Sequence, residues 1–242
     1  MQPAESLQGR EVVLAGGAGG IGAAVTETLL AEGVRVILSY HTHPERAAQW
    51  EGRAVLVQAD LMSSEDRTRL LQQARDLYAL VVLTGDPARF GEPSQMEAAM
   101  HRSHDINYLG PILLAREAAA RLKSSSTPGA IVLVSTMQAN ALFPGSTVYA
   151  AQKAALQHAA LILAKECQGA ANIRVNVVSP GITAAGMAEA SIAAGKYDRF
   201  LQDGSIPRFA RATDIARTIR FLLEPDSYIT GQVLCVDGGI TL

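Results

Sequence analysis

The sequence predicts an α/β fold in which a doubly wound, seven-stranded parallel sheet carries helices on both faces. Three observations predict it: short apolar runs recur along the chain, segments with helical spacing lie between them, and a glycine-rich turn follows the first run. The chain has 242 residues and 48% hydrophobic residues, enough to bury one large core. We therefore expect one domain over residues 1–242 rather than two small ones.

Seven runs of apolar, often β-branched residues predict the strands. The runs are continuous rather than alternating, which is typical of strands that are covered on both faces, as in a parallel sheet. They are Val12–Ala15, Val34–Leu38, Ala54–Val57, Leu80–Leu83, Ile131–Val134, Val175–Val178 and Val233–Val236.

Helices are expected between the strands. Residues with helical spacing are Ile21, Val25 and Leu29 near the N-terminus, and Ile215, Ile219 and Leu222 near the C-terminus. Ser63 with Asp66, and Thr213 just before Asp214, resemble helix starts. The short polar stretch 124–129 is interpreted as a loop. The β-α-β alternation predicts right-handed crossovers and ligand binding beyond the carboxyl ends of the strands.

Charge and composition argue against several classes of partner. The 21 Lys and Arg against 23 Asp and Glu give a net charge of −2, which provides no basic surface for nucleic acid. No basic stretch with a following apolar run opens the chain, and no apolar run reaches the roughly 18 residues that span a bilayer. We expect a cytoplasmic protein with no membrane partner.

The cysteines and histidines do not indicate a metal site. Cys167 and Cys235 lie far apart without metal-type spacing, which favours two unreactive core thiols over a disulfide. His41 with His43 and the pair at positions 101 and 104 lack the further ligands that a metal normally needs. No metal is therefore expected.

The turn after the first strand has the composition of a dinucleotide site. It reads Ala15-Gly16-Gly17-Ala18-Gly19-Gly20-Ile21-Gly22 and then opens a helix, the context of a Rossmann fold. Missing side chains allow a tight turn and a close approach to a pyrophosphate, which the helix N-terminus stabilises. The alternative is a plain glycine-rich turn. The candidate cofactor residues here are Gly16, Ala18, Gly19, Gly20, Ile21 and Gly22.

A second motif supplies candidate chemistry. Tyr149 and Lys153 are four residues apart and therefore lie on one face of a helix, about one turn from each other. A neighbouring ammonium lowers the pKa of a phenol, and such a tyrosine can exchange a proton with a substrate oxygen. The alternative is an ordinary solvated helix, because this spacing is common.

Together with the segments Ile173–Gly181 and Tyr228–Gly239, these motifs resemble the short-chain dehydrogenase/reductase family over nearly the whole chain. The pattern is most similar to 3-oxoacyl carrier-protein reductases. The resemblance implies an oxidoreductase that interconverts a ketone and a secondary alcohol with a nicotinamide cofactor, acts on a small molecule and assembles as a homotetramer. It also implies a mobile substrate lid over Met187–Leu201.

The resemblance also implies the roles of the site residues. Tyr149 would be the acid/base, and Lys153 would lower its pKa and hold the nicotinamide ribose. Thr136 would polarise the carbonyl, with Ser135 as the alternative, and Asn107 would hold a water in a proton relay. Further implied cofactor residues are Asp60, Leu61, Gly85, Pro180, Gly181 and Ile182.

The second strand favours NADP(H), with NAD(H) as the alternative. An acidic residue at its end would bond the ribose 2′-hydroxyl of NAD, and that position is Tyr40 here. His41 and Thr42 follow as candidate contacts, and Arg46 is near enough in sequence to bind a phosphate. The arginine or lysine that many NADP-dependent members carry in the glycine loop is Gly19.

The sequence departs from the family at three places, and the last two leave a competing hypothesis open. Ala15 replaces a threonine, Thr136 replaces the usual serine, and Val82-Leu83-Thr84-Gly85 replaces Asn-Asn-Ala-Gly. Two asparagines that normally brace the strands beside the cofactor are thus missing. Either this brace has been rebuilt, or the protein is a weakly active or inactive nucleotide-binding sensor or scaffold on the same fold.

Overall fold

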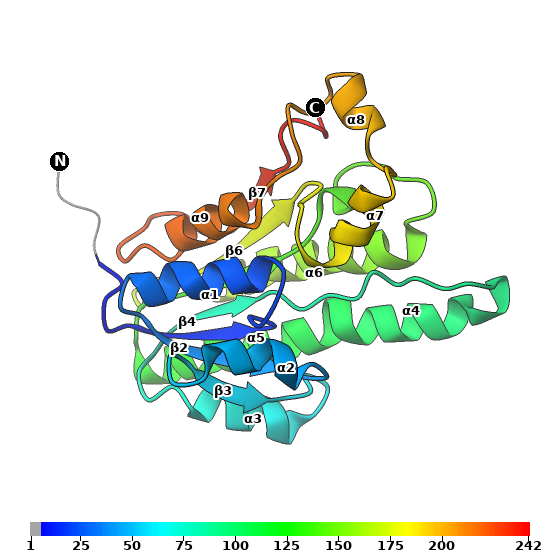
Figure 1. Ribbon diagram of the computed structural model, residues 1–242. Coiled ribbons are helices and arrows are strands. Elements are labelled where there is room, and N and C mark those ends of the chain that lie inside the picture. Colours follow the sequence, from blue (N-terminus) through cyan, green and yellow to red (C-terminus); the bar gives the residue numbers. More distant parts are fainter. Residues whose placement is uncertain (1–5) are drawn as a thin grey trace.

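The computed structural model describes residues 6–242, and it contains the predicted sheet of seven parallel strands (Figure 1). The strand order is β3-β2-β1-β4-β5-β6-β7. The strands are β1 (Glu11–Ala15), β2 (Arg35–Tyr40), β3 (Val55–Gln58), β4 (Leu77–Val82), β5 (Gly129–Val134), β6 (Ile173–Pro180) and β7 (Val233–Val236).

All seven predicted runs form strands, but several strands extend beyond the apolar run. β6 is the clearest case, since it continues to Pro180 and includes the buried polar residues Arg174 and Asn176. Asn176 donates to the carbonyl of Ile229, 2.8 Å away, which satisfies its buried amide. A search for apolar runs therefore misses the parts of a strand in which buried polar side chains have hydrogen-bond partners.

Helices occupy the connections between the strands. The longer ones are α1 (Ile21–Ala31), α3 (Ser64–Gln72), α4 (Met96–His104), α5 (Gly110–Ser125), α6 (Thr147–Glu166) and α9 (Ala212–Leu222). The short ones are α2 (Pro44–Ala47), η1 (Ala48–Trp50), η2 (Pro93–Gln95), η3 (Asp105–Leu109), η4 (Met137–Ala139), η5 (Gly186–Ala188), α7 (Glu189–Ala193) and α8 (Arg199–Gln202).

The sheet is covered on both faces because alternate strand residues point to opposite sides. On one face, Val12 and Leu14 of β1 share a buried cluster with Val25 of α1 and Ile219 of α9. On the other, Val13 joins the cluster that contains the buried residues of α3, α5 and α6. The doubly wound arrangement predicted from the sequence is confirmed.

Two of the predicted helix boundaries differ from the structure. Ser63 caps α3 as expected, accepting from the backbone N–H of Asp66 at 3.1 Å. Thr213 does not start α9; the capping residue is Arg211, whose N–H donates to the Asp214 carboxylate at 2.8 Å. The predicted loop 124–129 is also too long, because α5 continues to Ser125 and β5 begins at Gly129.

One cysteine lies outside the core. Cys167 is buried, but Cys235 is exposed, and both are free thiols. Cys235 belongs to β7, which has only β6 as a neighbour and forms an edge of the sheet. The prediction of two core thiols is therefore wrong for Cys235, since alternate residues of an edge strand need not be covered.

The strand order places a crevice at one end of the sheet. It reverses between β1 and β4, which are neighbours although they are far apart in sequence. Ligands of doubly wound folds bind beyond the carboxyl ends of the strands at such a switch point. Figure 1 shows α7 and α8 beyond the end of β6, and α4 extending away from the sheet. No helix within residues 6–242 has the length and apolar character that a membrane span requires.

Candidate active site

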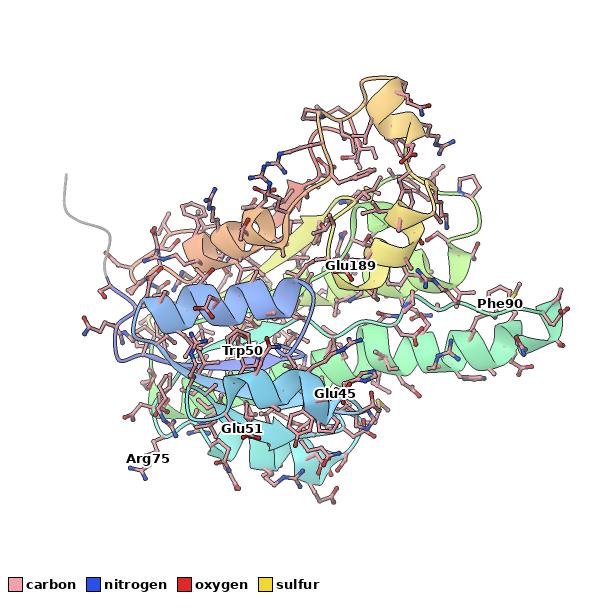
Figure 2. The ribbon with its side chains drawn as sticks, in the orientation of Figure 1. Glu45, Trp50, Glu51, Arg75, Phe90 and Glu189 are labelled. Atoms are coloured by element: carbon pink, nitrogen blue, oxygen red, sulfur yellow. The ribbon has the colours of Figure 1, made fainter. Side chains whose placement is uncertain are left out.

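A cleft of about 1450 Å³ opens at the carboxyl ends of the strands. In Figure 2, Glu189 and Glu45 lie toward this end of the sheet and Arg75 lies at the opposite end. The structure brings nearly all of the predicted site residues to the cleft wall. They are Gly16, Ala18, Gly19, Gly20, Ile21, Gly22, Tyr40, His41, Thr42, Asp60, Leu61, Gly85, Thr136, Tyr149, Lys153, Pro180, Gly181 and Ile182.

The glycine loop has the shape that a pyrophosphate requires. Gly16 and Gly20 have φ values of 81° and 55°, which favour glycine. A Cβ on Gly22 would lie 2.4 Å from the carbonyl oxygen of Gly16, so no side chain fits there. No side chain caps the N-terminus of α1 at Gly20, and its first turn has no acidic residue. Its N–H groups and dipole therefore suit an anion, and the loop fits a dinucleotide.

Arg46 provides positive charge beside the glycine loop. A Cβ on Gly19 would lie 3.4 Å from Cδ and 3.7 Å from Nη1 of Arg46, so the arginine of α2 occupies the space beside this glycine. Glu45, the first acidic residue after β2, pairs with His43 at 2.9 Å and does not line the cleft. Arg46 lines the cleft with Tyr40, the last residue of β2.

Asp60 lies on the cleft wall, at the turn between β3 and α3. One carboxylate oxygen accepts from the N–H of Met62 at 2.9 Å, which turns the chain toward α3. Asp60 also lines the cleft. The neighbouring Leu61 is held through its carbonyl, which accepts from the buried Arg67 at 2.7 Å. Helix entry and cleft wall are thus built by the same short segment.

The hydroxyl group that faces Tyr149 belongs to Thr136. The side chain of Thr136 hydrogen-bonds to Tyr149, and its Oγ1 also accepts from the N–H of Gln138 at 3.4 Å. The alternative, Ser135, donates its hydroxyl to the carbonyl of Lys153 at 3.1 Å and so fixes the backbone of α6. Of these two neighbours, only Thr136 is directed at the phenol.

Lys153 is held by backbone oxygens. Its Nζ donates to the carbonyls of Thr84 at 3.1 Å and Val134 at 2.9 Å, and the residue is only 2% exposed. Burial in the absence of a carboxylate lowers the pKa of Lys153 to about 7, because it disfavours the charged form.

The pKa of Tyr149 moves opposite to the expected direction. Desolvation raises the pKa of Tyr149 to about 12, although the hydrogen bond from Thr136 opposes this change. The sequence predicted a lowered pKa from a neighbouring ammonium. That prediction is wrong for this structure, because burial affects both groups and disfavours the phenolate as well as the ammonium.

Asn107 lies behind the cleft rather than on its wall. It sits in η3, a single turn of π-helix between α4 and α5, and is fully buried. Its amide donates to the carbonyl of Asp86 at 2.9 Å and accepts from the Asp86 N–H at 3.1 Å. A Cβ on Gly85 would lie 3.5 Å from Asn107 Oδ1 and 3.8 Å from Lys153 Nζ, so Gly85 separates the two.

The segment after β4 is braced through its backbone. Leu83 donates its N–H to the carbonyl of Ala15 at 2.8 Å, which joins it to the glycine loop. The carbonyl of Thr84 holds Lys153. A Cβ on Gly16 would lie 3.1 Å from Thr84, so the two turns pack tightly. These contacts connect the loop, the strand end and the lysine without the two asparagines of the family.

The end of β6 forms the opposite wall. A Cβ on Gly181 would lie 2.6 Å from Cα of Asp237, so only glycine fits between the two segments. Ile182 is fixed by its carbonyl, which accepts from the Ala210 N–H at 2.9 Å. Thr183 donates its hydroxyl back to the carbonyl of Gly181 at 3.1 Å. This hydroxyl is thus already engaged within the turn.

Residues of the segment Met187–Leu201 line the cleft, and the segment is hydrogen-bonded to the loop after β4. Arg89, between β4 and α4, donates to the carbonyl of Met187 at 3.0 Å and to Ser191 Oγ at 3.3 Å. The carboxylate of Glu189 accepts from the N–H of Gly186 at 3.0 Å. Arg89 was not predicted, and neither were the cleft residues Gln138 and Ser146, whose neighbours are set by loop geometry rather than by a motif.

The chain was compared with known proteins. The model of a family described as enoyl-(acyl carrier protein) reductase matches residues 16–241. An uncharacterized oxidoreductase of Methylorubrum extorquens is 32% identical over 97% of this chain and 98% of its own. The NADPH-dependent aldehyde reductase 2 of Arabidopsis thaliana, a chloroplastic protein, is 31% identical over 99% of this chain and 97% of its own.

Solved structures agree with these relatives. A short-chain type dehydrogenase/reductase of Mycobacterium ulcerans has a TM-score of 0.88 and 25% identity, and covers 98% of this chain and 91% of its own. The protein ElxO, solved with NADP bound, has a TM-score of 0.84 and 25% identity over 96% of this chain and 99% of its own. The matches span almost the whole sequence, and this protein belongs to the short-chain dehydrogenase/reductase family of oxidoreductases.

Proposed function

We propose that this protein is an NADP(H)-dependent oxidoreductase that interconverts a ketone and a secondary alcohol, with Tyr149 as the general acid/base. The observation that carries this proposal is the hydrogen-bonded pair of Thr136 and Tyr149 hydroxyls in the cleft, one helical turn from the buried Lys153. The glycine loop and the uncapped start of α1 support dinucleotide binding at the other end of the same cleft.

The protein residues account for proton transfer and orientation. A bound nicotinamide cofactor supplies the hydride. With a pKa of about 12, the hydroxyl of Tyr149 is protonated at neutral pH and can donate to the oxygen of a carbonyl undergoing reduction. Thr136 polarises the same oxygen through its hydroxyl. Lys153 would hold the nicotinamide ribose, while Asn107 would support the relay indirectly by fixing the Asp86 backbone beside Gly85.

NADP(H) is preferred over NAD(H) because Arg46 places positive charge at the end of the cleft where the adenosine of the cofactor would bind. Arg46 lies against Gly19 and has no carboxylate partner among the ion pairs of residues 6–242. In NAD-dependent enzymes, an acidic residue at the end of the second strand repels the 2′-phosphate of NADP. Tyr40 occupies this position here and is uncharged. The NADPH-dependent reductase of Arabidopsis and the NADP-bound ElxO structure support the same preference.

The remaining properties follow the family. We propose a single domain, a small-molecule carbonyl or alcohol substrate, a cytoplasmic location and a homotetramer. A second candidate is a nucleotide-binding sensor or scaffold without turnover. It is favoured by Val82-Leu83-Thr84, which replaces the two asparagines of the family, and by Thr136, which replaces the usual serine.

Turnover separates the two candidates. NADPH and NADH oxidation would be followed against a panel of ketones, including a 3-oxoacyl thioester, for the wild type and Tyr149→Phe. Turnover by the wild type that is lost in a variant that still binds NADPH supports the enzyme. Binding without turnover across the panel supports the sensor.

A further inference from the structure

Gln138 lies immediately beside the reacting groups. It belongs to η4, two residues after Thr136, and its backbone N–H donates to Thr136 Oγ1 at 3.4 Å. Its side chain is half-buried and lines the cleft. The mechanism proposed above gives this amide no role.

The amide of Gln138 is held in one orientation by Ser146. The Ser146 hydroxyl donates to Oε1 of Gln138. Ser146 precedes α6, and its own carbonyl accepts from the N–H groups of Tyr149 at 3.1 Å and Ala150 at 2.7 Å. Gln138 is thus attached to the same helical turn that carries the phenol. Its Nε2 donates to none of the residues from 6 to 242.

Part of the cleft wall next to η4 is apolar. Met137 and Ile182 are buried in a cluster against which Phe143, Tyr197 and Phe200 pack, and these aromatic residues line the cleft. An amide N–H that loses water without gaining an acceptor costs roughly 1–3 kcal/mol. When a substrate displaces water here, the free energy is recovered only if the substrate brings an acceptor oxygen to Nε2.

We propose that Gln138 is a specificity-determining residue whose side-chain N–H₂ donates to a second oxygen atom of the substrate. The preferred substrates are then carbonyl compounds that carry a hydroxyl or second carbonyl oxygen one or two carbons from the reacting carbon, rather than simple apolar ketones. This inference rests on the proposed function, because it assumes that the carbonyl is reduced between Thr136 and Tyr149.

The test compares three ketones that differ only in the second oxygen: butan-2-one, 3-hydroxybutan-2-one and 4-hydroxybutan-2-one. The readout is the ratio of kcat/KM for each hydroxyketone to that for butan-2-one. It is measured with NADPH for the wild type, Gln138→Leu, Gln138→Glu and Ser146→Ala. Gln138→Glu keeps an oxygen that accepts from Ser146 but cannot donate when ionised, so it separates donation to substrate from the support of the loop.

The wild type is expected to prefer at least one hydroxyketone, and both Gln138 variants are expected to lower that ratio five- to tenfold, about the effect of one neutral hydrogen bond. Ser146→Ala, which frees the amide, is expected to lower it by a smaller factor. A ratio unchanged in both Gln138 variants, or a wild type without preference, overturns the inference while the proposed function stands. No turnover of any ketone overturns both.

Discussion

Replacing Arg46 with alanine tests how the chain selects its cofactor. The guanidinium lies beside Gly19 and lines the cleft next to Tyr40. Hydrogen bonds to charged groups contribute about 1.5–3 kcal/mol, and Arg46 is exposed, so the lower end of this range applies. Because 1.4 kcal/mol is a factor of about ten, Arg46→Ala is expected to raise KM for NADPH about tenfold.

The assay compares the two cofactors in the same variant. KM for NADH, which lacks the 2′-phosphate, is expected to change by less than twofold. Arg53→Ala is the matched control, because Arg53 follows the same short helices but pairs with Glu27 at 3.0 Å and does not line the cleft. If Arg46→Ala raises KM for both cofactors equally, or for neither, Arg46 does not bind the 2′-phosphate.

Two further predictions concern the buried groups. Lys153 is charged in the folded protein only below its pKa of about 7, whereas an exposed lysine titrates near 10.5. Folding therefore releases a proton between these values, and stability rises with pH across this window. Lys153→Met removes that dependence. The free energy of unfolding of the variant minus that of the wild type should therefore be about 2–3 kcal/mol higher at pH 6 than at pH 9, measured by urea denaturation. An equal difference at both pH values would show that Lys153 is not desolvated. The last prediction concerns the two neighbouring hydroxyls. Thr136→Ala is expected to lower kcat at least tenfold, whereas Thr136→Ser is expected to keep most of the wild-type kcat. Ser135→Ala should mainly lower Tm, because the buried hydrogen bond from Ser135 to α6 is lost. Steady-state kinetics and thermal melts check both, and a larger loss of kcat in Ser135→Ala would reverse the assignment.

The fold could be predicted because it rests on local patterns. Continuous apolar runs identify strands that are covered on both faces, and all seven were found. Helix boundaries were predicted less well, because they depend on individual capping contacts and backbone angles that the apolar pattern does not show. The start of α9 depends on the carboxylate of Asp214 reaching back to Arg211, and the end of α5 on the left-handed conformation of Ser126, at φ 51°.

The site was predictable where residues have a fixed spacing in one element. Tyr149 and Lys153 share a helix, and the glycine loop is continuous in sequence. The position of Arg46 beside Gly19 was not predictable, since it depends on how α2 packs against a loop 27 residues earlier. The pKa of Tyr149 was also missed, because desolvation depends on segments from the whole cleft rather than on the neighbouring lysine.

The most direct test of the account is NADPH oxidation by the wild type and Tyr149→Phe with the same ketones, alongside NADPH binding. General acid catalysis by a positioned side chain contributes roughly 10²–10⁴-fold. We predict that the wild type turns over at least one ketone and that the phenylalanine variant loses this activity by about that factor while binding NADPH with the same affinity. Equal turnover by both proteins would contradict the assignment of Tyr149 as the acid/base.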